Sequence, residues 1–171
     1  MAVARIAAVL VLGLGLGLSA CGFRPMYGSE STSAEAEALL GSVAIAPIGD
    51  DRISQVLRND LIDRISAGRS ASNPRYRLDV KLERSELGGL VQTDASITRY
   101  VVTLRGNFRL VDVATGNSVM TEAARTTAAY NVPESEYAAI SAQSDAYNRA
   151  SGALADEIRA RVASFLETHR S

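Results

Sequence analysis

The sequence is poor in the residues on which most catalytic and metal sites depend. It holds one cysteine and one histidine in 171 residues, and it has no tryptophan. A single cysteine cannot form an internal disulfide, and it excludes paired-cysteine redox motifs and cysteine-rich zinc sites. The histidine, His169, stands third from the end of the sequence, where chains usually fray, so it is a poor general base. We therefore predict no catalytic residues, no metal site and no cofactor, and we expect that the protein is not an enzyme.

The balance of charge argues against a nucleic-acid-binding protein. Eighteen basic and 19 acidic residues give a net charge of −1. Proteins that bind nucleic acids usually carry a basic surplus, and aromatic residues that could stack on bases make up only 5% of this chain. The 47% hydrophobic and 22% charged residues are typical of a globular protein, and the length corresponds to one domain.

The first 20 residues have the layout of an export signal. Arg5 precedes an apolar run, Ile6–Leu18, and small residues then lead to the cysteine. The run is shorter than the roughly 20 residues that a membrane-spanning helix needs. We predict that residues 1–20 are a signal peptide and not a permanent membrane anchor.

The cysteine at the end of this signal indicates a lipoprotein. Leu18-Ser19-Ala20-Cys21 resembles the lipobox of bacterial lipoproteins, in which the cysteine sulfur receives S-diacylglycerol and the new amino group is acylated after cleavage. Two or three acyl chains hold a protein on a membrane stably, because each buried methylene contributes about 0.8 kcal/mol. We expect Cys21 to be this anchor, and Gly22 in place of an aspartate favours the outer membrane. The alternative is a secreted protein with a buried free cysteine.

Hydrophobic periodicity predicts a folded domain at residues 42–168, after a tether at residues 21–41. One aspartate of the turn Gly49-Asp50-Asp51 is placed to cap a helix for which Gly68 is a natural stop, and a polar connection at Ser85–Ser96 is longer than a tight hairpin needs. The expected fold is α+β: a two-layer sandwich with a four-stranded, mostly antiparallel or mixed sheet and two helices on one face, in the order β-α-β-β-β-α. The strands are expected at Val43–Ile48, Arg75–Glu83, Ile97–Val113 and Ser118–Tyr130. The last helix is expected at Ser135–Thr168, with a buried stripe of Tyr137, Ile140, Tyr147, Leu154, Ile158, Val162 and Phe165.

Strand alternation predicts one sheet face that carries charge. With Asp79 and Glu83 interspersed, this face is still net basic, and guanidinium groups bind phosphate oxygens in a bidentate way. The other interpretation is a solvated face with cross-strand charge pairs. The candidate binding residues are Arg77, Lys81, Arg99, Arg105 and Arg109.

Several segments resemble the LptE family of lipopolysaccharide-assembly lipoproteins. The residues that follow the lipobox are similar to the start of the mature family proteins, and the other segments correspond to the first helix, a central strand and the entry into the last helix. These segments are Cys21-Gly22-Phe23-Arg24-Pro25-Met26-Tyr27-Gly28, Asp51–Asn59, Ile97–Tyr100, Tyr130-Asn131 and Ser135–Ala138.

The resemblance implies a plug inside the lumen of an LptD-type outer-membrane β-barrel that inserts lipopolysaccharide into the outer leaflet. It also implies contacts with lipid A phosphates or core sugars, which arginines suit, although the five basic residues above come from strand parity and not from the family. A second hypothesis is a periplasm-facing lipoprotein that activates a cell-wall enzyme. The roughly 20-residue tether disfavours it, because extended chain spans at most about 3.3–3.6 Å per residue. A third hypothesis, an envelope hydrolase, lacks a catalytic constellation.

Overall fold

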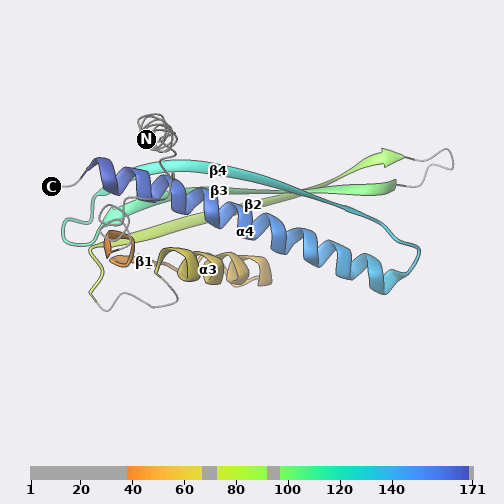
Figure 1. Ribbon diagram of the computed structural model, residues 1–171, viewed down its shortest axis with the longest axis horizontal. Helices are drawn as coiled ribbons and strands as arrows, with labels where there is room; N and C mark the ends of the chain where they lie inside the picture. The colour runs from red at the N-terminus through yellow and green to blue at the C-terminus, as the bar shows by residue number, and fades with distance from the viewer. Residues whose placement is uncertain (1–37, 67–72, 92–96, 170–171) are drawn as a thin grey trace, which may run out of the picture. The chain divides into compact units, whose positions relative to one another are not determined.

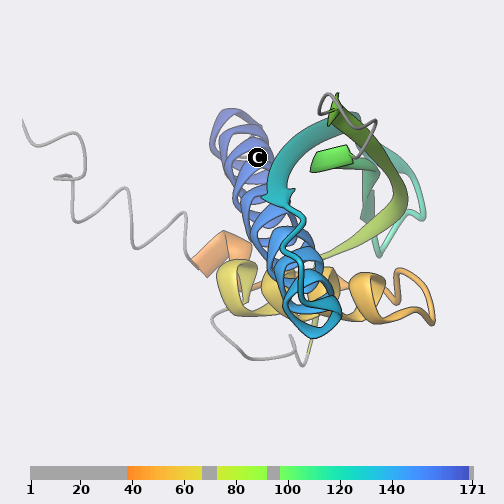
Figure 2. The ribbon, with the colours of Figure 1, turned by 90° about the vertical axis from the view of Figure 1, so that its right-hand side faces the viewer.

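Four strands form one sheet, and the helices lie on one of its faces (Figures 1 and 2). The computed structural model describes residues 38–66, 73–91 and 97–169, which all belong to the unit Ala34–Ser171. The strand order is β1-β2-β3-β4, with β1 parallel to β2 and the other neighbours antiparallel. The predicted α+β class and element order are confirmed. The elements are β1 (Val43–Ile45), α3 (Arg52–Ile65), β2 (Tyr76–Val91), β3 (Ile97–Asp112), β4 (Ser118–Asn131) and α4 (Glu136–Thr168).

The first part of the domain differs from the prediction in two details. A short helical segment at residues 38–40 precedes β1, so there is one helical segment more than the two expected. Helix α3 ends at Ile65 and not at Gly68, which lies outside the described residues, as do the signal, Cys21 and the tether up to residue 37. The predicted cap is confirmed: the Asp51 carboxylate accepts hydrogen bonds from the backbone N–H groups of Ile53 and Ser54.

Strand β2 is longer than its alternating pattern predicts. It continues to Val91, so most of the expected connection Ser85–Ser96 is strand, and residues 92–96 lie outside the described part. Pairing with β3 runs through Ser85 to Gly88 and then changes register between Gly88 and Leu90. Before this irregularity the inward positions of β2 already carry Arg84 and Glu86 in place of apolar residues, so the apolar alternation stops before the strand does.

The core lies between the sheet and the two helices. Gly106 faces α4, where an added Cβ would lie 3.3 Å from Ile158 Cδ1 and 3.6 Å from Leu154 Cδ2, so the missing side chain lets α4 approach β3 closely. The predicted α4 stripe is correct for Leu154, Ile158 and Val162, which are buried, and for Tyr147 and Phe165, which pack against the core.

The prediction is wrong at the start of α4. Tyr137 is 83% exposed and Ile140 is 60% exposed, and the first buried residue of the helix is Ala146. Helical periodicity continues toward the N-terminus of α4, but no strand or helix of the described chain packs against that end closely enough to bury these side chains.

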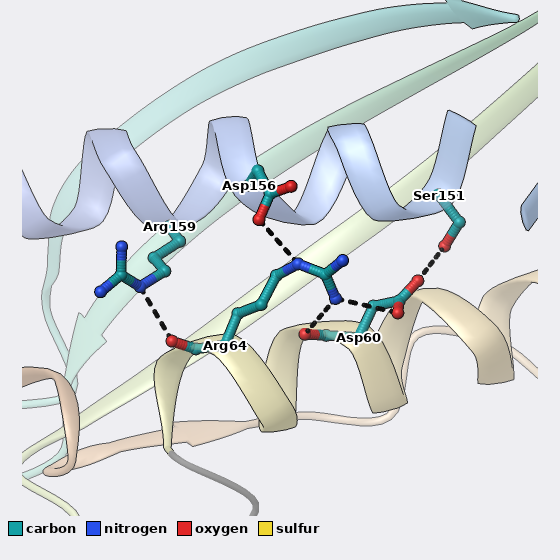
Figure 3. A network of polar contacts seen from close by, with 5 residues as sticks. All are labelled: Asp60, Arg64, Ser151, Asp156 and Arg159. Carbon is teal, nitrogen blue, oxygen red and sulfur yellow. Dashed lines mark hydrogen bonds and ion pairs between the residues drawn. The ribbon is translucent and has the colours of Figure 1, made fainter. Parts of the chain in front are cut away.

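Polar side chains join α3 to α4 (Figure 3). The Arg64 guanidinium bridges the carboxylates of Asp60, at 2.9 Å, and Asp156, at 2.7 Å. The Ser151 hydroxyl donates to Asp60 Oδ2 at 2.9 Å, and Arg159 Nε donates to the Arg64 carbonyl oxygen at 2.9 Å. This network fixes the position of one helix along the other.

Helix α4 also covers the outer edge of β4. Arg149 Nη2 donates to the Ala129 carbonyl oxygen at 3.1 Å, and Arg161 Nη1 donates to the Ala123 carbonyl oxygen. These carbonyl groups point away from β3 and would otherwise have no protein partner on that side.

Candidate functional site

The sheet face opposite the helices, here called the outer face, carries all five predicted basic residues. They alternate along β2 and β3 with residues such as Leu78, Leu104 and Phe108, whose side chains are buried under the helices. Each of the five is exposed to solvent. The structure thus brings Arg77, Lys81, Arg99, Arg105 and Arg109 onto one surface.

At one end of this face two arginines share one carboxylate. Arg77 Nε lies 2.8 Å from Asp79 Oδ1, and Arg109 Nη2 lies 3.0 Å from Asp79 Oδ2. Partial burial raises the pKa of Asp79, but hydrogen bonds from Arg77 and Arg109 and their positive charges outweigh this effect, and the pKa lies below its ordinary value. Both arginines are therefore already partnered, as the solvated-face interpretation expects.

Beside this group the outer face is hollowed. The hollow has a volume of about 370 Å³ and is open to solvent. Glu83 nearby accepts a hydrogen bond from Asn107 Nδ2 at 3.2 Å and lies 3.9 Å from Lys81 Nζ. The hollow is lined by Ala46, Pro47, Asp79, Val80, Lys81, Asn107, Phe108, Arg109 and Thr121.

The middle of the outer face carries arginines of a different kind. Arg105 on β3 is directly opposite Arg125 on β4, and Arg99 lies further along β3, opposite Asn131. Within the described ranges, none of these three arginines takes part in an ion pair. Like charges directly opposite each other destabilise a sheet, so an anion bound between Arg105 and Arg125 would relieve their repulsion.

Sequence reasoning missed Arg125. The pattern of β4 is weak, because small residues such as Ala123 and Ala129 occupy outer-face positions and give no contrast with the inner face. The signal that could have found Arg125 is the hairpin turn at residues 114–117, since a turn fixes which residues of the two strands face each other.

Along β3 from Arg105 toward Ile97, the outer face becomes apolar. Side chains that are paired across β2, β3 and β4 form rows on this face. The row after Arg105 and Arg125 consists of side chains with hydroxyl groups, and the row after that consists of Leu87, Val101 and Ala129. Leu87 is 74% exposed. Five basic and two acidic side chains at one end, followed by an apolar row with Arg99 beyond it, make a surface suited to an amphipathic anion.

The described residues contain neither a metal-binding cluster nor a membrane-spanning helix. No group of three or more histidine, cysteine, aspartate or glutamate side chains is arranged there to hold a metal ion. No described helix has both the length and the apolar composition needed to cross a bilayer.

The fold defines a class that includes several bacterial lipoproteins of known structure. A lipoprotein from Caulobacter crescentus superposes with a TM-score of 0.65 at 24% identity, covering 78% of this chain and 96% of its own. Rare lipoprotein B from Shewanella oneidensis gives a TM-score of 0.54 at 11% identity, covering 71% and 92%. Lipoprotein B from Nitrosomonas europaea gives 0.56 at 18%, covering 74% and 87%. These similarities establish the fold. No curated protein matches this chain in sequence.

The family is established by the sequence. Residues 40–162 match the LptE family, described as lipopolysaccharide-assembly, and this span is well over half of the chain. The chain therefore belongs to the LptE family, and the resemblance seen in its motifs is confirmed. By its family it is a lipopolysaccharide-assembly protein.

Proposed function

We propose that this protein is an outer-membrane lipoprotein that plugs an LptD-type β-barrel and binds lipopolysaccharide on the outer face of its sheet. Three acyl groups on Cys21 would hold it at the membrane, on the periplasmic side and in the barrel lumen. The protein would perform no catalysis; its work is to bind and position. The observation that carries the ligand part of the proposal is the opposed pair Arg105 and Arg125, without a carboxylate partner among the described residues.

The chemistry of the outer face matches lipid A in two respects. Phosphate groups are recognised best by guanidinium groups, which present parallel N–H donors and keep their charge at every relevant pH. The apolar row at Leu87 and Val101 lies beyond Arg105 and Arg125 on the same face, where acyl chains of a bound lipid would find apolar surface. Arg77 and Arg109, which are ion-paired with Asp79, would keep these contacts and contribute mainly to the positive potential of the face.

The partner and the anchor are tested by affinity purification from outer-membrane extracts. A tagged full-length chain should co-purify with an LptD-type barrel, and its depletion should reduce lipopolysaccharide at the cell surface. A Cys21→Ser variant is the control, since it cannot be acylated, and mass spectrometry of the mature wild-type N-terminus should show three acyl groups. The proposal is lost if the wild-type protein brings down no barrel and its depletion leaves surface lipopolysaccharide normal.

A further inference from the structure

The first ten residues of α4 form a helical extension that buries none of its side chains. We call this segment, Glu136–Asp145, the α4 overhang. It diverges from the strands at the end of the molecule where β4 gives way to α4 (Figure 1). Tyr137 and Ile140, three residues apart and hence on one side of the helix, are 83% and 60% exposed, and Val132 just before the helix is 38% exposed.

The overhang is held in a defined direction although it contributes nothing to the core. Gln143 Nε2 donates to the two carboxylate oxygens of Glu86 at 3.2 and 3.0 Å, and the Tyr147 hydroxyl donates to Glu86 Oε2 at 3.2 Å. The Tyr130 hydroxyl donates to the same carboxylate. Glu86 belongs to β2 and Tyr130 to β4, so one carboxylate ties the base of the overhang to the sheet. Tyr137 and Ile140 are thereby presented by a positioned helix.

The charge around these exposed apolar residues is negative. Residues 132–148 contain Glu134, Glu136 and Asp145 and no lysine or arginine. Glu86 on β2 adds a negative charge. Of the basic groups near the base of the overhang, Arg84 is paired with Asp51 at 2.9 Å and Arg149 donates to the Ala129 carbonyl oxygen. An anionic lipid would be repelled here, whereas it would be attracted by the outer face of the sheet. The charge complementarity points to a basic protein surface.

We propose that the α4 overhang is a protein-docking surface, separate from the lipid-binding face, which inserts Tyr137 and Ile140 into an apolar pocket rimmed by lysine or arginine side chains. This inference rests on the proposed function, in which the barrel is the partner that would carry this pocket. An exposed aromatic and an aliphatic residue one helical turn apart are the usual anchors when a helix binds in a groove. The acidic residues around them select against lipid A and for a basic rim.

The test uses the full-length acylated protein in outer-membrane extracts. The double variant Tyr137→Ser/Ile140→Ser should reduce the amount of co-purified barrel about tenfold or more, as loss of anchor residues does. The charge reversal Glu134→Lys/Glu136→Lys should reduce it as well. Val113→Ser is the matched control, because Val113 is also exposed, at 50%, but lies in the turn directly after β3. This variant should leave the barrel yield unchanged.

Two further readouts separate the possible results. Binding of purified lipopolysaccharide and the thermal midpoint should be the same in the overhang variants as in the wild type. A photo-crosslinking residue at position 137 should form an adduct with the barrel, and this holds as a test even if the serine variants fold poorly. If the wild type co-purifies with the barrel but the variants do so equally well and position 137 gives no barrel adduct, the docking surface is wrong and the proposed function stands. If the wild type brings down no barrel, the proposed function itself fails.

Discussion

Arg105 on β3 lies directly opposite Arg125 on β4, and among the described residues neither is joined to a carboxylate. Glu83, the neighbour of Arg105 on the other side, instead accepts from Asn107 and lies near Lys81. Such an arrangement costs the free protein a few tenths of a kcal/mol to about 1 kcal/mol. Under the proposed function, a phosphate group of the ligand would supply a counter-ion and relieve this repulsion.

Replacing either arginine should therefore weaken lipid binding without unfolding the domain. A hydrogen bond to a charged group contributes about 1.5–3 kcal/mol, so Arg105→Ala or Arg125→Ala should lower lipid A affinity by roughly tenfold or more. The free energy of unfolding should stay equal or rise slightly. Binding is measured by calorimetry at two salt concentrations, since screening weakens exposed charge contacts.

Arg77→Ala is the matched control for these two variants. Arg77 is also exposed, but it is already hydrogen-bonded to Asp79. Its loss should affect lipid affinity much less than the loss of Arg105. If all three substitutions weakened lipid A binding equally, or if none weakened it, the outer face would be a solvated surface without a specific ligand.

The N-terminal cap of α3 should make stability depend on pH. The hydroxyl of Ser54, 2.7 Å from Asp51 Oδ2, is the main reason why the pKa of Asp51 lies below its ordinary 3.8, and backbone N–H groups and Arg84 add to it. Because the pKa is lowered on folding, the ionised cap stabilises the fold above about pH 3.8, and this stabilisation is lost as the pH falls through the folded-state pKa.

Asp51→Ala should consequently cost about 0.5–2 kcal/mol at neutral pH. The difference from the wild type should shrink when urea unfolding is repeated below pH 3.8. Asp50→Ala removes an adjacent carboxylate that makes no cap and should change little at either pH. A wild-type to Asp51→Ala difference that is constant with pH would contradict the role of the ionised cap.

Removing the carboxylate of Glu86 should loosen the N-terminal half of α4. Glu86→Ala leaves the donors of Tyr130, Gln143 and Tyr147 without their acceptor, at about 1–3 kcal/mol for each group that stays buried and unsatisfied. Hydrogen exchange in residues 136–147 should accelerate. Glu83→Ala, on the opposite face of β2, should not change it.

Tyr130 supplies a spectroscopic check on the same variant. Burial raises the pKa of its hydroxyl, and the hydrogen bond to the negative Glu86 raises it further. In Glu86→Ala the pKa should move back toward 10, as measured by the ultraviolet absorbance of tyrosinate. An unchanged Tyr130 titration would mean that the Glu86 contact does not persist in solution.

A side chain at position 106 should separate α4 from the sheet. In Gly106→Val the added atoms would meet Ile158 and Leu154, and overpacking of this kind costs about 1–3 kcal/mol. Gly89→Ala is the control, because an added Cβ there lies 4.0 Å from the Arg99 carbonyl oxygen and meets nothing closer. Denaturant midpoints of the two variants should differ clearly, and similar midpoints would show that the core repacks around the valine.

Much of the fold could be predicted because two regular patterns are undisturbed. Tyr76, Leu78 and Val80 alternate with charged residues on β2, and Asp51 has a capping side chain at a helix start. These two features depend on local sequence alone. The order of the strands in the sheet is not predicted by the sequence; in the structure β2, β3 and β4 are neighbours both in the chain and in space.

The errors arose where burial depends on a distant element. Tyr137 and Ile140 continue the helical period of Leu154 and Ile158, but period alone does not say where the surface that covers a helix ends. The importance of Arg125 likewise depends on its register with Arg105, which a strand of small residues does not reveal. Candidate binding residues could thus be placed on a face, whereas their partners could not.

The arginines that cover β4 also protect the chain against aggregation. An exposed strand edge is a template on which another molecule can add a strand, and repetition of that step builds insoluble fibrils. With Arg149 and Arg161 on its carbonyl groups, β4 offers little to an incoming chain. Because α4 follows β4 in the chain, this edge stays open until the last helix of the described chain has formed.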